Sequence, residues 1–311
     1  MNKISRYLSL SRPDHWFKNL FMLPGVIFGL LLSEKLPAHL GFILFIGLLS
    51  TCLIASANYV INEWLDRHFD KYHPTKKHRS AVHGDLDGRV VYTEYALFAI
   101  AGLVLAYFIG HQFLLFSALL LIMGLLYNVP PIRTKDKLYL DVLSESLNNP
   151  IRFLLGWSIV EFHYLPPSSI LLAYWMGGAF LMGVKRFAEY RFIRDPFKAA
   201  LYRRSFRFYT EHSLLISSFF YALCSAFFLG IFLIKYRIEY LILLPFLALL
   251  FTWYLRIGLS SDSSAQSPEK LYREKRFMGY TAFLCVLFLI LSFINLPWLN
   301  FLLNKSLVTW K

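Results

Sequence analysis

The chain carries little charge and little cysteine for its length. Only 16% of its 311 residues are charged, whereas soluble domains average about 25%. The three cysteines, Cys52, Cys224 and Cys285, lie far apart in apolar runs, which argues against a disulfide framework or a cysteine metal site. No small-residue cleavage pattern follows the first apolar run, so we expect no cleavable signal peptide. With 57% hydrophobic residues, the composition excludes an ordinary soluble enzyme and favours a membrane protein.

Nine apolar segments are candidates for membrane-spanning helices. A spanning helix needs roughly 20 mostly apolar residues. The candidate segments lie near residues 19–33, 40–62, 92–109, 112–128, 141–160, 167–185, 213–234, 239–258 and 280–303. We therefore predict one all-α polytopic membrane domain over residues 1–311, with nine transmembrane helices.

Basic residues are unevenly divided between the two sides of this arrangement. If the N-terminus is cytoplasmic and the spans alternate, most of the 32 lysines and arginines fall on the cytoplasmic side, as the positive-inside rule predicts. The exceptions are Lys35, Arg152, Lys235, Arg237, Lys305 and Lys311. The net charge of +13 is therefore explained by membrane topology and does not indicate a nucleic-acid partner. We predict that the protein lies in an inner (cytoplasmic) membrane, in contact with membrane lipids.

The long connections between spans lie on the same predicted side. They are residues 63–91, 129–140, 186–212 and 259–279. Because long connections usually carry function while short ones join helices, we predict that the active site faces the cytoplasm.

The second segment ends in three oxygen-bearing side chains spaced four residues apart. Asn62, Asp66 and Asp70 share one face of a helix, and carboxylate and amide oxygens suit magnesium (Mg²⁺). Lys76 and Arg79 follow at once, so the acids can hold a metal while the bases hold the phosphate oxygens of a metal–diphosphate complex. The alternative is a solvated helix end whose acids pair with neighbouring basic residues. Carboxylates at the membrane end of an apolar helix are usually functional, which favours the metal site.

A second polar group follows the fourth segment. Arg133 and Lys135 supply cations, and Asp141 and Glu145 repeat the four-residue carboxyl spacing. Asp141 is a candidate metal ligand, or a carboxylate that stabilises the N-terminus of the next helix. Arg152 lies about two turns deeper, and a lone arginine inside a span usually lines a polar cavity.

A third polar group closes the sixth segment. Lys185, Arg186 and Glu189 occupy its end, and we favour a place in the site over simple anchoring at the membrane surface. Near the N-terminus, Lys18 precedes the first span and is expected to reach the same polar cavity.

These residues resemble the UbiA superfamily of intramembrane prenyltransferases. The matching patterns are Asn62-x₃-Asp66-x₃-Asp70 and Tyr127-x₇-Lys135-x₅-Asp141. The resemblance implies nine helices around a central cavity that opens sideways to lipid, with Mg²⁺ bridging the acids to a diphosphate.

One branch, decaprenyl-phosphate phosphoribosyltransferase, is resembled more closely. The further matches are Arg12-Pro13, Trp16 and Lys18-Asn19; His73 to Lys76 with Arg79 and Gly84; Arg152 and Gly156; and Lys185, Arg186, Ala188 and Glu189. The sequence departs from the branch at Glu63, where aspartate is usual.

The resemblance implies a transferase that moves 5-phosphoribose from phosphoribosyl diphosphate to a polyprenyl phosphate. It implies Asp66, Asp70, Lys76 and Tyr127 as catalytic residues and Asn62, Asp66, Asp70 and Asp141 as metal ligands. The implied substrate-binding residues are Lys18, Arg79, Arg133, Lys135, Arg152, Lys185, Arg186 and Glu189. The alternative is a prenyltransferase that uses a prenyl diphosphate and an aromatic or other small acceptor. A transporter or lipid-binding scaffold is less favoured, because transporters usually carry polar groups and broken helices near mid-membrane.

Overall fold

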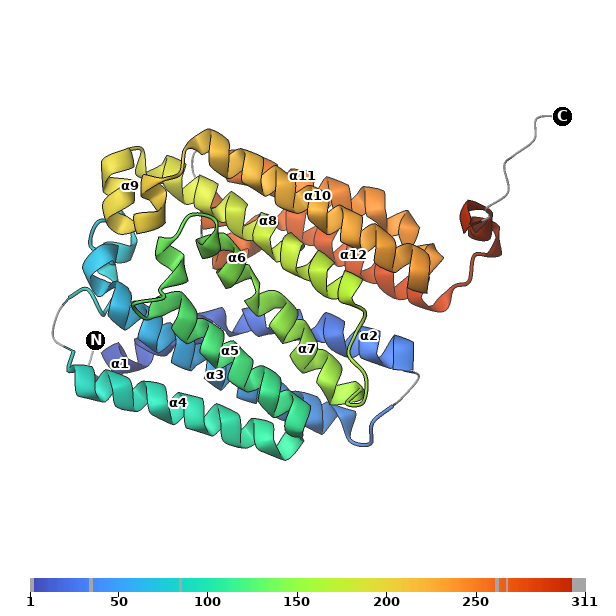
Figure 1. Cartoon of the computed structure of the whole chain (residues 1–311), viewed down its shortest axis with the longest axis horizontal. Helices are drawn as coiled ribbons and strands as arrows, with labels where there is room; N and C mark the ends of the chain where they lie inside the picture. Colours follow the sequence, from blue (N-terminus) through green and yellow to red (C-terminus); the bar gives the residue numbers. More distant parts are fainter. Residues whose placement is uncertain (1–2, 34–35, 84–85, 261–262, 267, 304–311) are drawn as a thin grey trace.

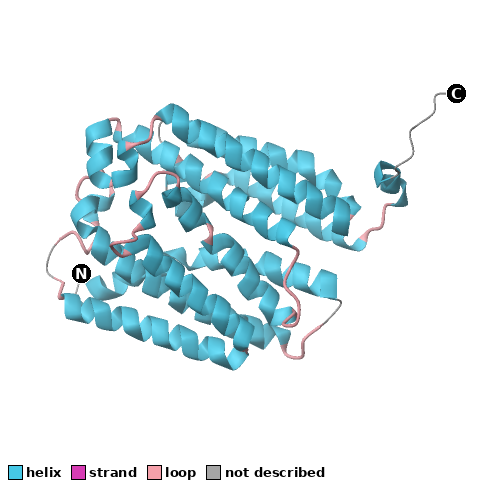
Figure 2. Ribbon diagram, in the orientation of Figure 1, coloured by secondary structure: helices cyan, strands magenta, loops and turns pink. Residues whose placement is uncertain are grey.

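The protein is a bundle of helices. The computed structural model describes residues 3–33, 36–83, 86–260, 263–266 and 268–303, and no strand occurs among them (Figures 1 and 2). Gly84 and the basic residues Lys35, Lys305 and Lys311, which the sequence analysis singled out, lie outside these ranges.

The helices follow one another with short connections. They are α1 (Lys3–Leu8), α2 (Leu23–Ser33), α3 (Leu40–Asp70), α4 (Gly88–Ile109), α5 (His111–Asn128), α6 (Leu140–Ser146), α7 (Asn148–Val160), α8 (Ser168–Ile193), α9 (Pro196–Tyr202), α10 (Glu211–Tyr236), α11 (Leu243–Leu259) and α12 (Lys275–Phe293). Nine 3₁₀ segments complete them: Ser9–Ser11, Pro13–Met22, Lys76–His78, Thr134–Asp136, Arg204–Arg207, Ile238–Ile242, Ser264–Gln266, Pro268–Arg273 and Pro297–Leu303.

Each of the nine predicted spans overlaps helical structure. Seven helical stretches within the described ranges are long and apolar enough to cross a membrane, which makes the chain a multi-pass membrane protein. The other two predicted spans correspond to α6–α7, which is broken at Leu147, and to α8, whose last turns are charged. The all-helical class is thus confirmed, while the count of nine stays a prediction.

The helices extend further than the apolar runs that predicted them. The predicted connection 63–91 begins with two more turns of α3, and the connection 186–212 contains the end of α8, the whole of α9 and a 3₁₀ turn. Conversely, the predicted span 280–303 is wrong at its end, because α12 stops at Phe293 and a 3₁₀ segment begins at Pro297. Hydropathy marks the apolar part of a helix, whereas backbone hydrogen bonds continue through polar turns.

Two groups of helices form the bundle. Figure 1 shows α3, α4, α5 and α7 on one side and α8, α10, α11 and α12 on the other. One apolar core lies among α3, α5 and α7 and a second among α8, α10, α11 and α12. Between α2 and α7 the contact is backbone to backbone: a Cβ at Gly156 would lie 1.9 Å from the Met22 carbonyl oxygen, and one at Gly25 would lie 2.0 Å from that of Phe153. Glycine at both positions is therefore required for this pair of helices to meet.

The C-terminal ends of α3, α5 and α8 meet at one end of the bundle. The connecting residues 71–83, 129–139 and 194–210 lie there with α9 (left in Figure 1). We call this region the polar end, because it contains most of the side chains predicted to form the site.

Candidate active site

The carboxylates of α3 contact cations from two different connections. Asp66 Oδ1 accepts hydrogen bonds from Arg133 Nη2 at 2.8 Å and pairs with Lys135 Nζ at 2.6 Å. Asp70, which is 3% exposed, pairs through Oδ2 with Arg79 Nη1 at 2.8 Å. The acids of the second span therefore point toward the basic connections and not toward lipid.

Two asparagines join this acidic stripe to α5. Asn128 Oδ1 accepts hydrogen bonds from Asn62 Nδ2 at 2.5 Å and from Lys135 Nζ at 2.6 Å. Lys135 is buried, and burial lowers its pKa to about 8 even though the carboxylate of Asp66 acts in the opposite direction. The ammonium group is thus charged at neutral pH. It lies beside Asp66, where it can also contact a phosphate group bound near that carboxylate.

A second polar cluster centres on Glu189, which is 1% exposed. Its Oε1 pairs with Lys76 Nζ at 2.6 Å and its Oε2 with Arg186 Nη1 at 2.8 Å. The Tyr202 hydroxyl contacts the Lys76 ammonium as well as Glu189. Burial would lower the pKa of Lys76, but the nearby Glu189 outweighs it and the pKa is raised. Lys76 is therefore a permanent cation of the polar end.

Arg186 connects Glu189 to the end of α5. Its Nη2 contacts Glu145 and donates to the Tyr127 hydroxyl at 3.1 Å. The same hydroxyl donates to Glu145 Oε2 at 2.7 Å. Tyr127 is thus held in one orientation by a buried arginine and a carboxylate.

Asp141 lies behind this cluster and is fully buried. Its oxygens accept hydrogen bonds from the Tyr209 hydroxyl at 2.8 Å and from Ser205 at 3.1 Å. Arg186 and Arg203 are its ion-pair partners, at 3.6 and 3.9 Å. These contacts are those of a carboxylate that balances the charge of buried arginines. The metal role of Asp141 stays a prediction.

The remaining predicted cations, Arg152, Lys18 and Lys185, lie near other polar groups. Arg152 donates to Asn19 Oδ1 at 2.9 Å, and Lys18 Nζ lies 2.9 Å from His15 Nδ1. Lys185 is half-buried beside Arg186, with Lys18 among its charged neighbours. Glu145 and Glu189 are also charged neighbours of Lys185, so this lysine adjoins the cluster around Glu189.

The comparisons with known proteins identify the family. A model of the UbiA prenyltransferase family matches residues 22–279. The chain belongs to this family. It is similar to nodulation protein NoeC of Azorhizobium caulinodans (31% identity over 214 residues, 67% of this chain and 65% of that protein). It is also similar to decaprenyl-phosphate phosphoribosyltransferase of Mycolicibacterium smegmatis (26% over 221 residues, 68% and 65%). The match thus spans about 65% of the length of each relative.

A solved UbiA homologue shows the same fold. The structure from Archaeoglobus fulgidus bound to DMAPP and Mg²⁺ is 22% identical, has a TM-score of 0.69, and covers 93% of this chain and 100% of that one. The predicted UbiA-like, all-α membrane fold is therefore confirmed.

The Mg²⁺ that this family implies fits the donor set of α3. Among the described residues, no three His, Cys, Asp or Glu side chains converge to form a closed metal site. Mg²⁺ does not require one, since it commonly binds one or two carboxylates and completes its shell with water and substrate phosphates. Asp66, Asp70 and the amide oxygen of Asn62 are oxygen ligands of that kind.

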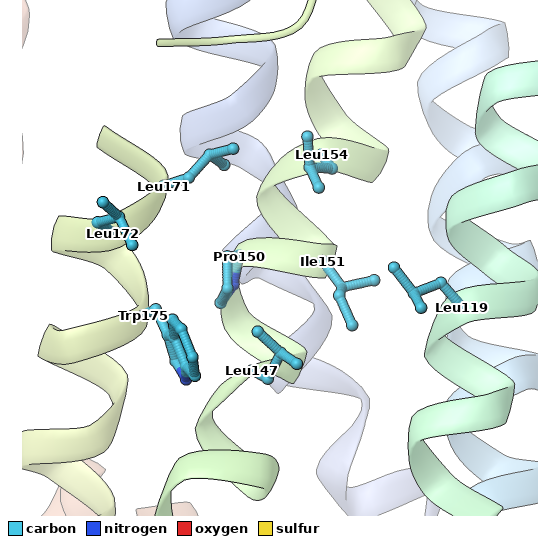
Figure 3. Close-up of a pocket in the computed structure, with 8 residues that line it drawn as sticks. All are labelled: Leu119, Leu147, Pro150, Ile151, Leu154, Leu171, Leu172 and Trp175. Atoms are coloured by element: carbon cyan, nitrogen blue, oxygen red, sulfur yellow. The ribbon is translucent and has the colours of Figure 1, made fainter. Parts of the chain in front are cut away.

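Two cavities elsewhere in the described structure contain none of the predicted site residues. One of about 190 Å³ is apolar (Figure 3) and is lined by Leu119, Leu147, Pro150, Ile151, Leu154, Leu171, Leu172 and Trp175. The other, of about 420 Å³, is lined by Leu32, Ser33, Trp157, Glu161, Tyr164, Leu165, Pro167 and Tyr236. Neither unites acids with cations as the polar end does, so the polar end is the candidate active site.

The sequence analysis missed four residues of the connection 194–210. Tyr202, Arg203, Ser205 and Tyr209 all contact residues of the polar end. A basic run at the end of a span is ordinarily a topology signal, so the sequence pattern counts Arg203 only among the cytoplasmic cations. Only the packing of α9 distinguishes it from them.

Proposed function

We propose that this UbiA-family protein is a Mg²⁺-dependent transferase at the cytoplasmic face of the inner membrane. It moves 5-phosphoribose from phosphoribosyl diphosphate to a polyprenyl phosphate and releases diphosphate. The supporting observation is that two cation groups converge on the polar end. One pairs with the acids of α3, and the other surrounds Glu189. Two anionic substrates that meet in one site need this amount of positive charge.

The donor diphosphate binds at the acids of α3 in this proposal. Asn62, Asp66 and Asp70 would hold the metal, and a bound Mg²⁺ would supply charge neutralisation for the leaving diphosphate. Arg79 and Lys135 lie within 3 Å of these acids, so their donors are placed to bind phosphate oxygens at the same site. Such charge-assisted bonds are among the strongest in proteins.

The second cation group binds the acceptor and orients it. The bond from ribose C1 to the diphosphate oxygen breaks, C1 develops oxocarbenium character, and a phosphate oxygen of the lipid forms the new bond from the opposite face. A phosphate monoester is largely dianionic near neutral pH, since its second pKa is about 6, so no strong general base is needed. Arg186 and the Tyr127 hydroxyl that it orients lie beside this path, and Lys18, Arg152 and Lys185 provide cations toward the membrane.

A second candidate reaction uses the same acids. A prenyltransferase would bind a prenyl diphosphate, as the Archaeoglobus fulgidus homologue binds DMAPP with Mg²⁺. An aromatic acceptor, however, needs few cations beyond those that hold the diphosphate. The cations around Glu189 therefore favour the phosphoribosyl reaction, and the similarity to the Mycolicibacterium smegmatis enzyme points the same way.

The test is product analysis with purified protein. Labelled phosphoribosyl diphosphate and a polyprenyl phosphate are supplied with Mg²⁺, and a parallel reaction receives a prenyl diphosphate and an aromatic acid. Mass spectrometry of the extracted lipids should find a phosphoribosyl polyprenyl phosphate in the first reaction only. A prenylated aromatic product would establish the second candidate, and the absence of both products would leave a scaffold or transporter as the better description.

A further inference from the structure

The connection between α8 and α10 is folded over the polar end. Asp195 begins α9 by accepting hydrogen bonds from the amides of Phe197 at 2.9 Å and Lys198 at 3.2 Å, and Pro196 occupies the first turn, as is common at helix N-termini. Tyr202 at the end of α9 is buried in an apolar cluster with Phe206. This packing fixes the backbone on both sides of Arg203, which directly follows Tyr202.

Arg203 points inward from this anchored segment. Its side chain is 12% exposed, and its Nη1 donates to the Tyr127 hydroxyl at 3.3 Å. Its carboxylate partner is Asp141, at 3.9 Å. That same Oδ2 atom lies 3.6 Å from Arg186 and already accepts a hydrogen bond from Ser205. The counter-ion of Arg203 is therefore distant and shared.

Three other guanidinium groups of the polar end are better compensated. Arg79, Arg133 and Arg186 each have a carboxylate oxygen at 2.8 Å. The Nε atoms of Arg186 and Arg203 are both buried without a hydrogen-bond partner among the described residues, but Arg203 has no carboxylate closer than 3.9 Å to offset this. Burying a guanidinium is unfavourable unless its donors are used. The environment of Arg203 thus suits an additional anion.

We infer that Arg203 binds a phosphate monoester of a substrate. The inference rests on the proposed function, because phosphoribosyl diphosphate carries such a group on its ribose and polyprenyl phosphate carries one as its head group. A prenyl diphosphate donor has none. The planar guanidinium fork matches phosphate oxygens. The Tyr202 ring lies 5.9 Å from this guanidinium, and the Lys76 ammonium contacts the hydroxyl of the same tyrosine. Arg203 is thereby a specificity-determining residue, and it selects substrates by a phosphate outside the metal–diphosphate complex.

The experiment compares Arg203→Gln and Arg203→Lys with Arg207→Gln. Arg207 is exposed at the end of the 3₁₀ turn that Arg203 precedes, and no side-chain hydrogen bond or ion pair among the described residues involves it. Its substitution therefore removes an equal charge from the same connection. Each purified protein is titrated with ribose 5-phosphate, with a short-chain polyprenyl phosphate, and with inorganic diphosphate plus Mg²⁺. Loss of charge-assisted hydrogen bonds should weaken monoester binding by Arg203→Gln about 10- to 100-fold. Diphosphate binding should stay near wild type, which also shows that the variant is folded, and Arg203→Lys should recover part of the loss.

The pattern of losses identifies the source of the phosphate. A selective loss with ribose 5-phosphate assigns Arg203 to the donor, and a selective loss with the lipid phosphate assigns it to the acceptor. Unchanged binding of both monoesters, an equal loss for diphosphate, the same loss in Arg207→Gln, or a wild-type protein that binds neither monoester would overturn the inference. These titrations need no turnover, so they are independent of the product analysis that decides the proposed function.

Discussion

Replacement of Asp66 by asparagine is the sharpest test of the metal site. The substitution keeps the shape of the side chain and removes one charge. Asp66 is the carboxylate on which two cations of the connection 129–139 converge, with Arg133 at 2.8 Å and Lys135 at 2.6 Å. We expect phosphoribosyl transfer to be lost while the membrane fold persists.

The contacts of Asp66 indicate how much folding stability and how much catalytic rate the Asp66→Asn variant should lose. Removing one member of a buried ion pair can cost 3–5 kcal/mol, roughly, in folding stability. Here Lys135 keeps Asn128 at 2.6 Å and Arg133 keeps Asp136 at 3.1 Å, so we expect a loss of only about 1–3 kcal/mol. The loss of a charged metal ligand is worth several kcal/mol in the transition state, and about 4 kcal/mol corresponds to about a 10³-fold lower rate.

The assay pairs product formation with thermal unfolding in detergent, and Asp136→Asn is the matched control. Asp136 also pairs with Arg133, and its side chain is 19% exposed against 16% for Asp66. If Asp136→Asn lowers the rate as much as Asp66→Asn does, the effect comes from a displaced Arg133 and the metal assignment is refuted. Wild-type turnover by Asp66→Asn would refute it directly.

Two further substitutions test the packing and the second cluster. Gly156→Ala places a Cβ 1.9 Å from the carbonyl oxygen of Met22, just before α2, so it should lower the free energy of unfolding by about 1–3 kcal/mol. Gly279→Ala is the control and should not lower the free energy of unfolding, because nothing lies within 4 Å of the added Cβ. Equal unfolding temperatures for the two variants would contradict the close approach of α2 and α7. Glu189→Gln removes the counter-ion that Lys76 and Arg186 share. We expect it to destabilise the protein by about 3–5 kcal/mol and to reduce turnover, and a variant with wild-type thermal stability and kcat would show that the cluster is dispensable.

The helices could be read from the sequence, but their ends could not. Every predicted apolar segment overlaps a helix, because a span must satisfy its backbone hydrogen bonds internally. The polar turns that carry the site lie just beyond those segments. The last turns of α3 and of α8 were predicted as connections, although they are helical to Asp70 and Ile193. Hydropathy does not report helices that continue into polar sequence.

The site was predictable where charge spacing is local. The four-residue spacing on α3 and the basic residues that follow it indicated that acids and cations meet there, and the structure pairs Asp70 with Arg79. Arg203 was not predictable, because in sequence it is one cation in a basic run. Its separate role depends on contacts with Tyr127 and Asp141, which come from distant helices.

The ion pairs at the polar end have a consequence for the order of binding. Asp66, Asp70, Arg79 and Lys135 already compensate one another. Free Mg²⁺ would take the carboxylates and leave buried cations unpaired, whereas free diphosphate would take the cations and leave carboxylates unpaired. Either state carries the penalty of an uncompensated buried charge. A metal–diphosphate complex brings a cation for the carboxylates and an anion for Arg79 and Lys135 at the same time, so no buried charge is left unpaired.

Mg²⁺ and diphosphate should therefore bind to this protein cooperatively, beyond their affinity for each other in solution. By linkage, the factor by which saturating diphosphate strengthens Mg²⁺ binding must equal the factor by which Mg²⁺ strengthens diphosphate binding. A coupling of about 1–3 kcal/mol, or roughly 5- to 150-fold, is typical of such linked sites. Calorimetric titration of each ligand with and without the other, corrected for the complex formed in buffer, measures the factor. Independent binding of the two ligands would mean that the acids and cations of the polar end do not exchange partners, and the proposed use of these ion pairs would fail with it.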